Sequence, residues 1–124
     1  MNPAADSDPQ CGQILWAQFS PTEGKEYSGH RPALVISNDN YHQLVTDMVV
    51  TLPITTVSRG WLNHVPVSPL RILSRPSWIV VEQPRAIARS RITKFGDVVD
   101  DKTMTQVEQW LDILLKREPV FAML

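Results

Sequence analysis

The stretch "GHRPALVIS", residues 29–37, predicts a strand that begins with an arginine–proline pair. Proline fixes φ and has no N–H for a sheet ladder, and the residue before it is driven toward extended conformations. Arg31 is therefore held on a constrained backbone at the mouth of the strand, and Gly29 leaves room in front of it. Two interpretations follow: a fixed cation that grips an anion, or the ordinary start of an edge strand.

Short apolar segments around this stretch predict a mainly β protein. In "GQILWAQF", residues 12–19, Ile14 and Trp16 alternate with Leu15 and Ala17, as in a strand. The connection 20–29 is long, polar and glycine-containing, which is typical of a functional loop. The remaining predicted elements are a turn or single helical turn at 38–43, strands at 47–54, 64–68 and 77–83, and extended pieces at 85–92 and 96–99.

The last segment changes its period and predicts a helix within residues 100–118. Met104, Val107, Leu111 and Leu114 recur at intervals of three and four, so we expect them to pack against the sheet. The cap is either a Thr103–Gln106 capping box or Asp101. Prolines within the predicted strands, followed by one terminal helix, favour a small β-barrel or a strongly bent sheet.

Composition is that of one ordinary globular domain. The chain has 124 residues, 43% of them hydrophobic and 20% charged, and a single cysteine, Cys11. It begins with an acidic, proline-containing stretch, which predicts a flexible tail over residues 1–10 before a single domain over 11–124. Because this start lacks a signal peptide's pattern and no apolar run is long enough for a membrane helix, we expect a cytoplasmic protein that does not bind membranes.

Charge is distributed unevenly along the chain. Residues 30–95 carry eight arginines and lysines against three acidic residues, although the whole chain has a formal net charge of -1. Such asymmetry indicates either a face that binds a polyanion or charges scattered over a solvated surface.

The sequence offers little for metal or cofactor chemistry. His30, His42 and His64 lie 12 and 22 residues apart, and Cys11 is remote from them. No close pair of metal ligands occurs, and there is neither a glycine-rich phosphate loop nor a G-x-S-x-G motif. We therefore expect no metal and no cofactor.

Three separated motifs resemble the MazF/PemK family of toxin endoribonucleases. They are "GQILW" at residues 12–16, "GKEYSGHRP" at 24–32 and "EQPR" at 82–85, in the family's order and spacing. The resemblance covers about residues 12–115 and implies an SH3-like small β-barrel with a C-terminal helix. It further implies a metal-independent toxin that cuts single-stranded RNA or mRNA at short sequences, forms a homodimer and is neutralised by a cognate antitoxin with an acidic, partly disordered segment. Residues 11–124 would then be one MazF-like toxin domain.

The resemblance also assigns roles to individual residues. Arg31 and Thr55 match the family's catalytic arginine and threonine, and Glu26 matches a loop acid that some members need for cleavage. The positions of Glu82, Gln83 and Arg85 match the third motif, where PemK-type members place a catalytic acid and RNA contacts. This chain has Val80 where those members have an arginine. The general base is therefore left open between Glu26 and Glu82.

Physical chemistry supports these roles. Metal-free cleavage of RNA builds negative charge on the phosphoryl oxygens, which a fixed guanidinium and a threonine hydroxyl stabilise well. Arginine is a poor base because its pKa lies above about 12. We expect the substrate to be bound by further basic and aromatic side chains. These are Arg59, Arg85 and Arg89 for phosphates and Trp61 for a base, although Trp61 also suits a core or dimer contact.

Two other classes of protein remain as alternatives. One is a CcdB-like toxin of the same fold that poisons a topoisomerase by binding it. The other is an inactive barrel that serves as an interaction module. The combination of Arg31, Thr55 and "EQPR" argues for the nuclease instead.

Overall fold

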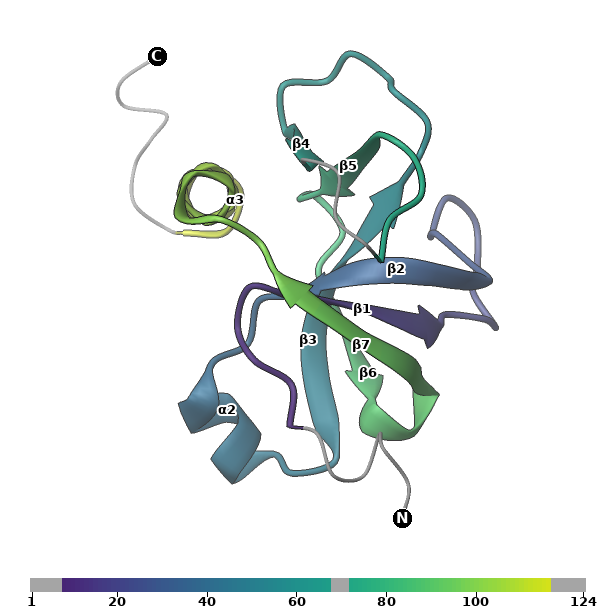
Figure 1. Ribbon diagram of the computed structural model, residues 1–124, viewed down its shortest axis with the longest axis vertical. Helices are drawn as coiled ribbons and strands as arrows, with labels where there is room; N and C mark the ends of the chain where they lie inside the picture. Colours follow the sequence, from purple (N-terminus) through teal and green to yellow (C-terminus); the bar gives the residue numbers. More distant parts are fainter. Residues whose placement is uncertain (1–7, 68–71, 117–124) are drawn as a thin grey trace.

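The computed structural model describes residues 8–67 and 72–116 of the chain. Residues 1–7 of the predicted tail lie outside this range. In chain order the described elements are β1 (Gln13–Gln18), β2 (His30–Val35), α2 (Asp39–Leu44), β3 (Met48–Thr55), β4 (His64–Val67), β5 (Ser77–Val80), β6 (Arg85–Ala88), the 3₁₀ turn η1 (Arg89–Arg91), β7 (Ile92–Val98) and α3 (Asp101–Leu115) (Figure 1).

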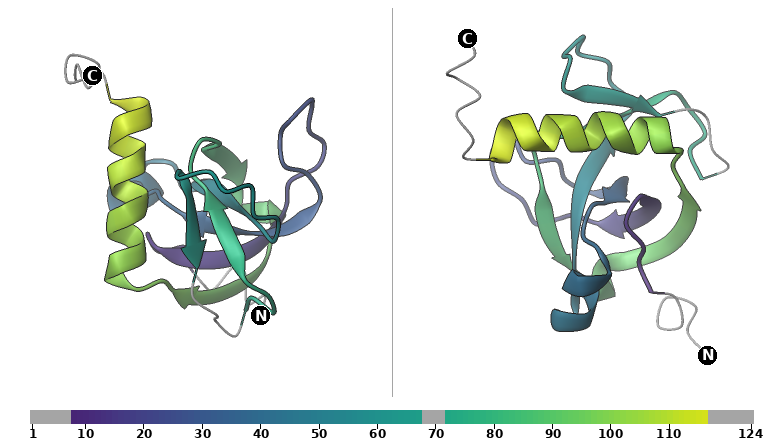
Figure 2. Two further views of the ribbon diagram at one scale, coloured as in Figure 1. Left: turned by 90° about the horizontal axis from the view of Figure 1, so that it is seen from above. Right: turned by 90° about the vertical axis from the view of Figure 1, so that its left-hand side faces the viewer.

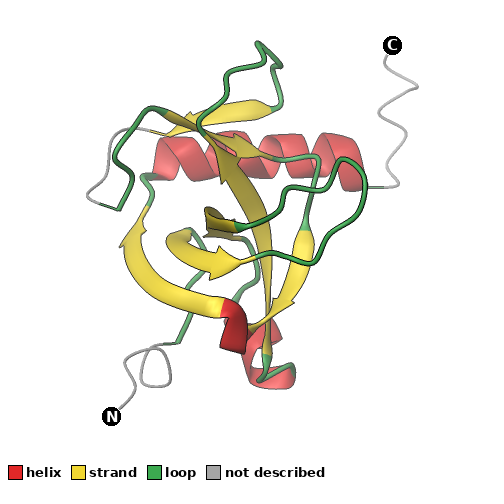
Figure 3. Cartoon of the chain, turned by 90° about the vertical axis from the view of Figure 1, so that its right-hand side faces the viewer, coloured by secondary structure: helices red, strands yellow, loops and turns green. Residues whose placement is uncertain are grey.

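The strands form one antiparallel sheet in the order β4-β5-β3-β2-β1-β7, with β6 also paired to β3. The long strand β3 pairs with β6 through Met48–Thr51 and with β5 through Ile54 and Thr55. The sheet curls like a small barrel (Figure 3), but the barrel does not close, because the end strands β4 and β7 are not paired with each other. The predicted mainly β fold with a C-terminal helix is confirmed. Strand β2 lies between β1 and β3 and is not an edge strand, but its first three residues, His30 to Pro32, pair with β1 alone, because the pairing with β3 begins at Ala33.

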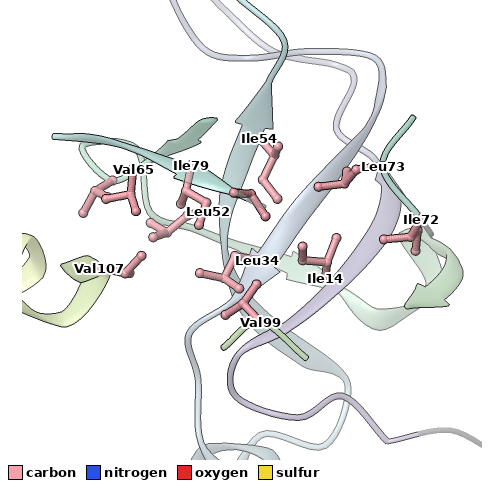
Figure 4. Close-up of a cluster of buried hydrophobic side chains, with 12 residues drawn as sticks. Ile14, Leu34, Leu52, Ile54, Val65, Ile72, Leu73, Ile79, Val99 and Val107 are labelled. Carbon is pink, nitrogen blue, oxygen red and sulfur yellow. The ribbon is translucent and has the colours of Figure 1, made fainter. Parts of the chain in front are cut away.

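The central strands are buried on both faces, which explains their nearly continuous apolar runs. Ile14, Leu34 and Leu52 point into one cluster together with residues of β4, β5 and α3 (Figure 4). Alternate residues, such as Leu15 and Ala33, point into a second cluster on the opposite face. The alternation predicted for residues 12–19 therefore sorts side chains between two cores.

Helix α3 lies across the curled sheet (Figure 2) and closes the first cluster. Val107 is fully buried, and Met104 and Leu111 pack against the cluster. Leu114, expected in the core, is 43% exposed because it belongs to the last turn of the helix, beyond Val107 and Leu111.

Asp100 caps helix α3, and neither predicted cap is correct. Its carboxylate accepts a hydrogen bond from the Thr103 amide at 2.8 Å. Hydrogen bonding of the ionised form by the Thr103 side chain, followed by the Thr103 amide, lowers the pKa of Asp100 below its usual value.

Strand β5 stops at Val80, three residues earlier than predicted, so Glu82 and Gln83 lie in the turn that follows it.

In the part of the chain that the structure describes, no helix has the length and apolar character needed to cross a membrane.

Candidate functional site

Arg31 is held in place by backbone carbonyls at the start of β2. Its Nε donates a hydrogen bond to the Ser28 carbonyl at 2.8 Å, and its Nη1 donates to the Ile54 carbonyl at 3.3 Å. The guanidinium also lies over the Tyr27 ring, 4.8 Å from the centroid. Burial lowers the pKa of Arg31, partly offset by Tyr27, and the group stays protonated at neutral pH. The result is a fixed, partly desolvated cation.

The loop before Arg31 is closed at its neck by Gly29. Its φ of +77° is one that glycine adopts without strain. The Gly29 N–H donates to Ser20 Oγ at 2.9 Å, and the Gly29 carbonyl accepts from the Phe19 amide at 2.9 Å. Gly29 therefore sets the path of the chain into Arg31, rather than only leaving space before it.

Arg31 lines two different grooves. The first, which we call the Trp61 groove, has a volume of about 440 Å³ and is lined by Gly24, Lys25, Glu26, Tyr27, Ser28, Arg31, Arg59, Trp61, Glu82 and Gln83. The second, which we call the Thr55 groove, has a volume of about 280 Å³ and is lined by Trp16, His30, Arg31, Pro32, Ile54, Thr55, Thr56, Val57, Leu73, Ser74, Arg75 and Ser77. Arg31 is the residue that the two grooves have in common.

Thr55 lies at the end of β3 beside the Ile54 carbonyl that holds Arg31. Its Oγ1 accepts a hydrogen bond from the Val57 amide at 3.1 Å. Because the oxygen is the acceptor in this bond, the hydroxyl proton stays available for donation to a ligand. The structure thus places the two predicted catalytic residues along one groove.

Glu26 and Gln83 organise the loop above the Trp61 groove. The Glu26 carboxylate accepts a hydrogen bond from the Glu23 amide at 2.7 Å. The Gln83 side chain donates to the Lys25 carbonyl at 3.2 Å and accepts from the Tyr27 amide at 3.4 Å. Gln83, predicted from the sequence as an RNA contact, therefore also ties the loop to the turn after β5.

The Glu82 carboxylate is bound by two side chains, those of Asn63 and His64. Its Oε1 accepts from Asn63 Nδ2 at 2.8 Å, and both of its oxygens lie 3.0 Å from His64 Nε2. Trp61 packs on the His64 ring, with the centroids 4.9 Å apart, and is itself 51% exposed. Trp61 is therefore a surface residue of the groove and not part of the core of this chain.

The remaining predicted arginines differ in their positions. Arg59 lies over the Trp61 ring at 5.8 Å and lines the same groove. Arg85 donates to the Phe19 carbonyl at 2.7 Å and lines an adjoining hollow of about 340 Å³ that shares Lys25, Glu26, Tyr27 and Gln83 with the Trp61 groove.

Arg89 lies apart from the other predicted site residues. It pairs with Asp8 at 3.1 Å, donates to the His42 carbonyl at 3.4 Å and lines a separate hollow near α2. Burial, followed by the charge of Arg89, lowers the pKa of His42. Strand β6 runs extended from Arg85, opposite Thr51, to Ala88, opposite Met48, so Arg89 lies beyond the far end of the strand, where its N–H bonds to the Asp47 carbonyl.

Sequence reasoning missed three residues of the Thr55 groove: Trp16, His30 and Arg75. The Trp16 and His30 rings lie 5.2 Å apart, and Trp16 Nε1 donates to the Ile72 carbonyl at 3.1 Å. Trp16 also packs against the first core cluster. Only the register of β1 against β2, which pairs Trp16 with Pro32, places it in the groove with Arg31, and the sequence does not contain that register.

Among the described residues, no three His, Cys, Asp or Glu side chains come together as a metal site. The chemistry that the described groups themselves offer is that of a fixed cation, a hydroxyl donor and carboxylates beside open grooves.

Comparisons with known proteins identify the family. The model of the PemK-like, MazF-like toxins of type II toxin–antitoxin systems matches residues 10–115. The endoribonuclease toxin MazF of Escherichia coli K12 is 36% identical over 96 residues, which are 76% of this chain and 83% of that protein.

Solved structures agree with this match. A MazF structure from Deinococcus radiodurans superposes with a TM-score of 0.78 at 26% identity, covering 89% of this chain and 98% of that one. A MazE–MazF structure from the same organism has a TM-score of 0.71 at 28% identity, covering 89% and 97%. The family predicted from the sequence is confirmed: this chain belongs to the PemK-like, MazF-like toxins of type II toxin–antitoxin systems.

Proposed function

We propose that this chain is an endoribonuclease toxin that cuts single-stranded RNA, and that Arg31 binds the phosphate at the cleavage site. The observation that carries the proposal is the position of Arg31, which is fixed by two carbonyls and lines both the Trp61 groove and the Thr55 groove. An RNA strand that runs through both grooves brings one phosphate to the guanidinium. The curated relative from Escherichia coli is named an endoribonuclease, in agreement with the function expected from the sequence.

The proposed reaction is an attack of the ribose 2′-OH on the adjacent phosphorus. The O2′–P bond forms and the P–O5′ bond breaks, giving a 2′,3′-cyclic phosphate and a 5′-OH. The 2′-OH proton passes to a base, and the 5′ oxygen takes up a proton as it leaves. Arg31 stabilises the charge that builds on the phosphoryl oxygens, and the Thr55 hydroxyl donates to one of them.

Glu26 is the base that we propose. Glu26 lines the Trp61 groove together with Arg31. Among the described residues, its carboxylate accepts a hydrogen bond from one group, the Glu23 amide of the same loop. Glu82 is instead occupied by two side-chain donors, Asn63 and His64. Geometry therefore leaves Glu26 with more capacity to accept a proton.

Cleavage is expected to persist in excess EDTA, because Arg31 supplies the positive charge at the phosphate. The measurement is incubation of the purified protein with a long RNA, with and without EDTA, followed by chemical mapping of both new ends. We expect 2′,3′-cyclic phosphate, or its hydrolysis product, and a free 5′-OH. Loss of activity on chelation that magnesium restores would contradict the proposed mechanism.

The same cleavage assay, together with growth after induction of the protein in cells, separates the alternative classes. A CcdB-like toxin would arrest growth without cutting bare RNA, and an inactive barrel would do neither. The two grooves and the fixed Arg31 favour the nuclease.

We also propose a homodimer in the cytoplasm, neutralised by an acidic antitoxin segment that occupies the RNA grooves. Arg31 and Arg59 present positive charge in the Trp61 groove, and Trp61 adds an exposed apolar face. An acidic, partly disordered segment with apolar anchors fits such a surface.

RNA affinity is therefore expected to fall more steeply with salt than antitoxin affinity. Each phosphate contact on a single strand contributes a slope of about 0.7 in log affinity against log salt, whereas apolar burial is not screened. Arg59→Gln should make the RNA salt slope shallower by about 0.7, the contribution of one phosphate contact. The measurement is paired titration of RNA and antitoxin peptide across salt, with a competition arm. A ternary complex would show that the grooves are not shared, and a flat RNA slope would show that the basic side chains do not contact phosphates.

A further inference from the structure

We infer that Tyr27 is a positioning residue for Arg31, because its ring holds the guanidinium in one orientation and leaves its charge and its free N–H groups to a phosphate. The guanidinium carbon lies over the Tyr27 ring, 4.8 Å from the ring centroid. The inference rests on the proposed endoribonuclease function and adds to it a residue that acts through Arg31 rather than on the reacting atoms.

The contact between Tyr27 and Arg31 is built by the path of the loop. In an extended chain, the Cα atoms of residues four positions apart lie about 13 Å from each other. Gly29, with its φ of +77°, turns the chain between the two residues and so lets the ring reach the guanidinium. The Tyr27 amide donates to Gln83 Oε1 at 3.4 Å, which ties the backbone of Tyr27 to the turn after β5. The backbone on both sides of the contact is therefore constrained.

The hydrogen bonds of Arg31 leave part of its guanidinium free. A guanidinium has five N–H donors. One bonds to the Ser28 carbonyl and one to the Ile54 carbonyl, so three remain. Tyr27 covers a face of the group and uses none of these donors. The free donors lie in the plane of the guanidinium, which is where a phosphate is bound by two parallel hydrogen bonds.

An aromatic ring orients a cation without neutralising it. A carboxylate in the place of Tyr27 would cancel the charge of Arg31 and occupy its donors. None of the ion pairs among the described residues includes Arg31. The ring attracts the cation through the negative potential of its face and keeps water from that side. The partly desolvated cation then interacts more strongly with the charge that develops on the phosphoryl oxygens.

The first test compares single-turnover cleavage by Tyr27→Leu and Tyr27→Phe. Leucine removes the ring face, so we expect the rate to fall about threefold to thirtyfold, the range for a partly desolvated cation–π contact. Phenylalanine keeps the ring face and should keep a rate close to that of the wild type. Binding of an RNA with a 2′-deoxy nucleotide at the cut, which lacks the attacking hydroxyl, should change less than the rate. The reason is that Arg31 makes its strongest contact as charge builds in the transition state.

Tyr41 provides the matched control, because it is the other tyrosine of the chain. It lies on α2 with its ring edge-on to the His42 ring, and it lines neither the Trp61 groove, the Thr55 groove nor the hollow beside Arg85. Tyr41→Leu should therefore leave the cleavage rate unchanged.

The second test separates attraction by the ring from packing. Difluorinated and trifluorinated phenylalanines, introduced at the position of Tyr27→Phe, keep nearly the same shape and progressively weaken the negative potential of the ring face. We expect the rate to fall stepwise along this series, which does not depend on a variant that alters packing. A flat series, or a Tyr27→Phe protein as slow as Tyr27→Leu, would overturn the role of Tyr27 while leaving the endoribonuclease intact. Absence of any RNA cleavage by the wild type would overturn the proposed function itself.

Discussion

Replacing Arg31 with lysine is expected to lower the single-turnover rate of RNA cleavage by about a hundredfold or more, as for loss of a donor that stabilises an oxyanion. The guanidinium bonds to the Ser28 and Ile54 carbonyls and still has N–H groups for a phosphate. A lysine ammonium is a single point of charge and cannot do both. The change therefore removes the fixed orientation even though it keeps the charge.

Arg91 provides the matched control for this experiment. Its Nη1 also donates to two backbone carbonyls, of Gln18 at 2.9 Å and of Ser20 at 2.6 Å, but it lines neither the Trp61 nor the Thr55 groove. Arg91→Lys should leave the rate within a few-fold of wild type. A folded Arg31→Lys protein with a near-normal rate would mean that Arg31 only supports the backbone.

Leu34→Ala is expected to destabilise the fold by about 2–5 kcal/mol, the usual cost of a cavity at a buried leucine. Leu34 is fully buried in the second half of β2, where it packs in one cluster with Ile14 and Leu52. Natural domains have only about 5–15 kcal/mol of stability, so this single change removes a large part of it. Urea unfolding at fixed protein concentration measures it as a lower midpoint with an unchanged slope.

Leu44→Ala makes the same change at an exposed site. Leu44 is 84% exposed on α2, so we expect an effect within about 0.5 kcal/mol. If Leu34→Ala cost no more than Leu44→Ala, β2 could not be a central strand of the core.

The mainly β fold and the terminal helix could be predicted from the sequence because their signals are local, and the family because its three motifs follow one another along the chain. Period-two alternation in residues 12–19 and the three-to-four spacing in α3 are properties of single segments. The Arg31–Pro32 pair constrains its own backbone wherever the strand lies. These features do not depend on which distant residue is the neighbour, so the sequence alone determined them.

Only the tertiary structure decided how the site is assembled around Arg31. The bond from Arg31 to Ile54, the tie between Gln83 and the loop, and the pairing of His64 with Glu82 join residues 18 to 58 positions apart. Such contacts depend on strand register and on where each turn ends, as the early end of β5 and the displacement of Arg89 demonstrate. The sequence determines which side chains are present, but the packing of the whole sheet determines which distant residue each one bonds to. The reason is that many strand registers satisfy the same local pattern.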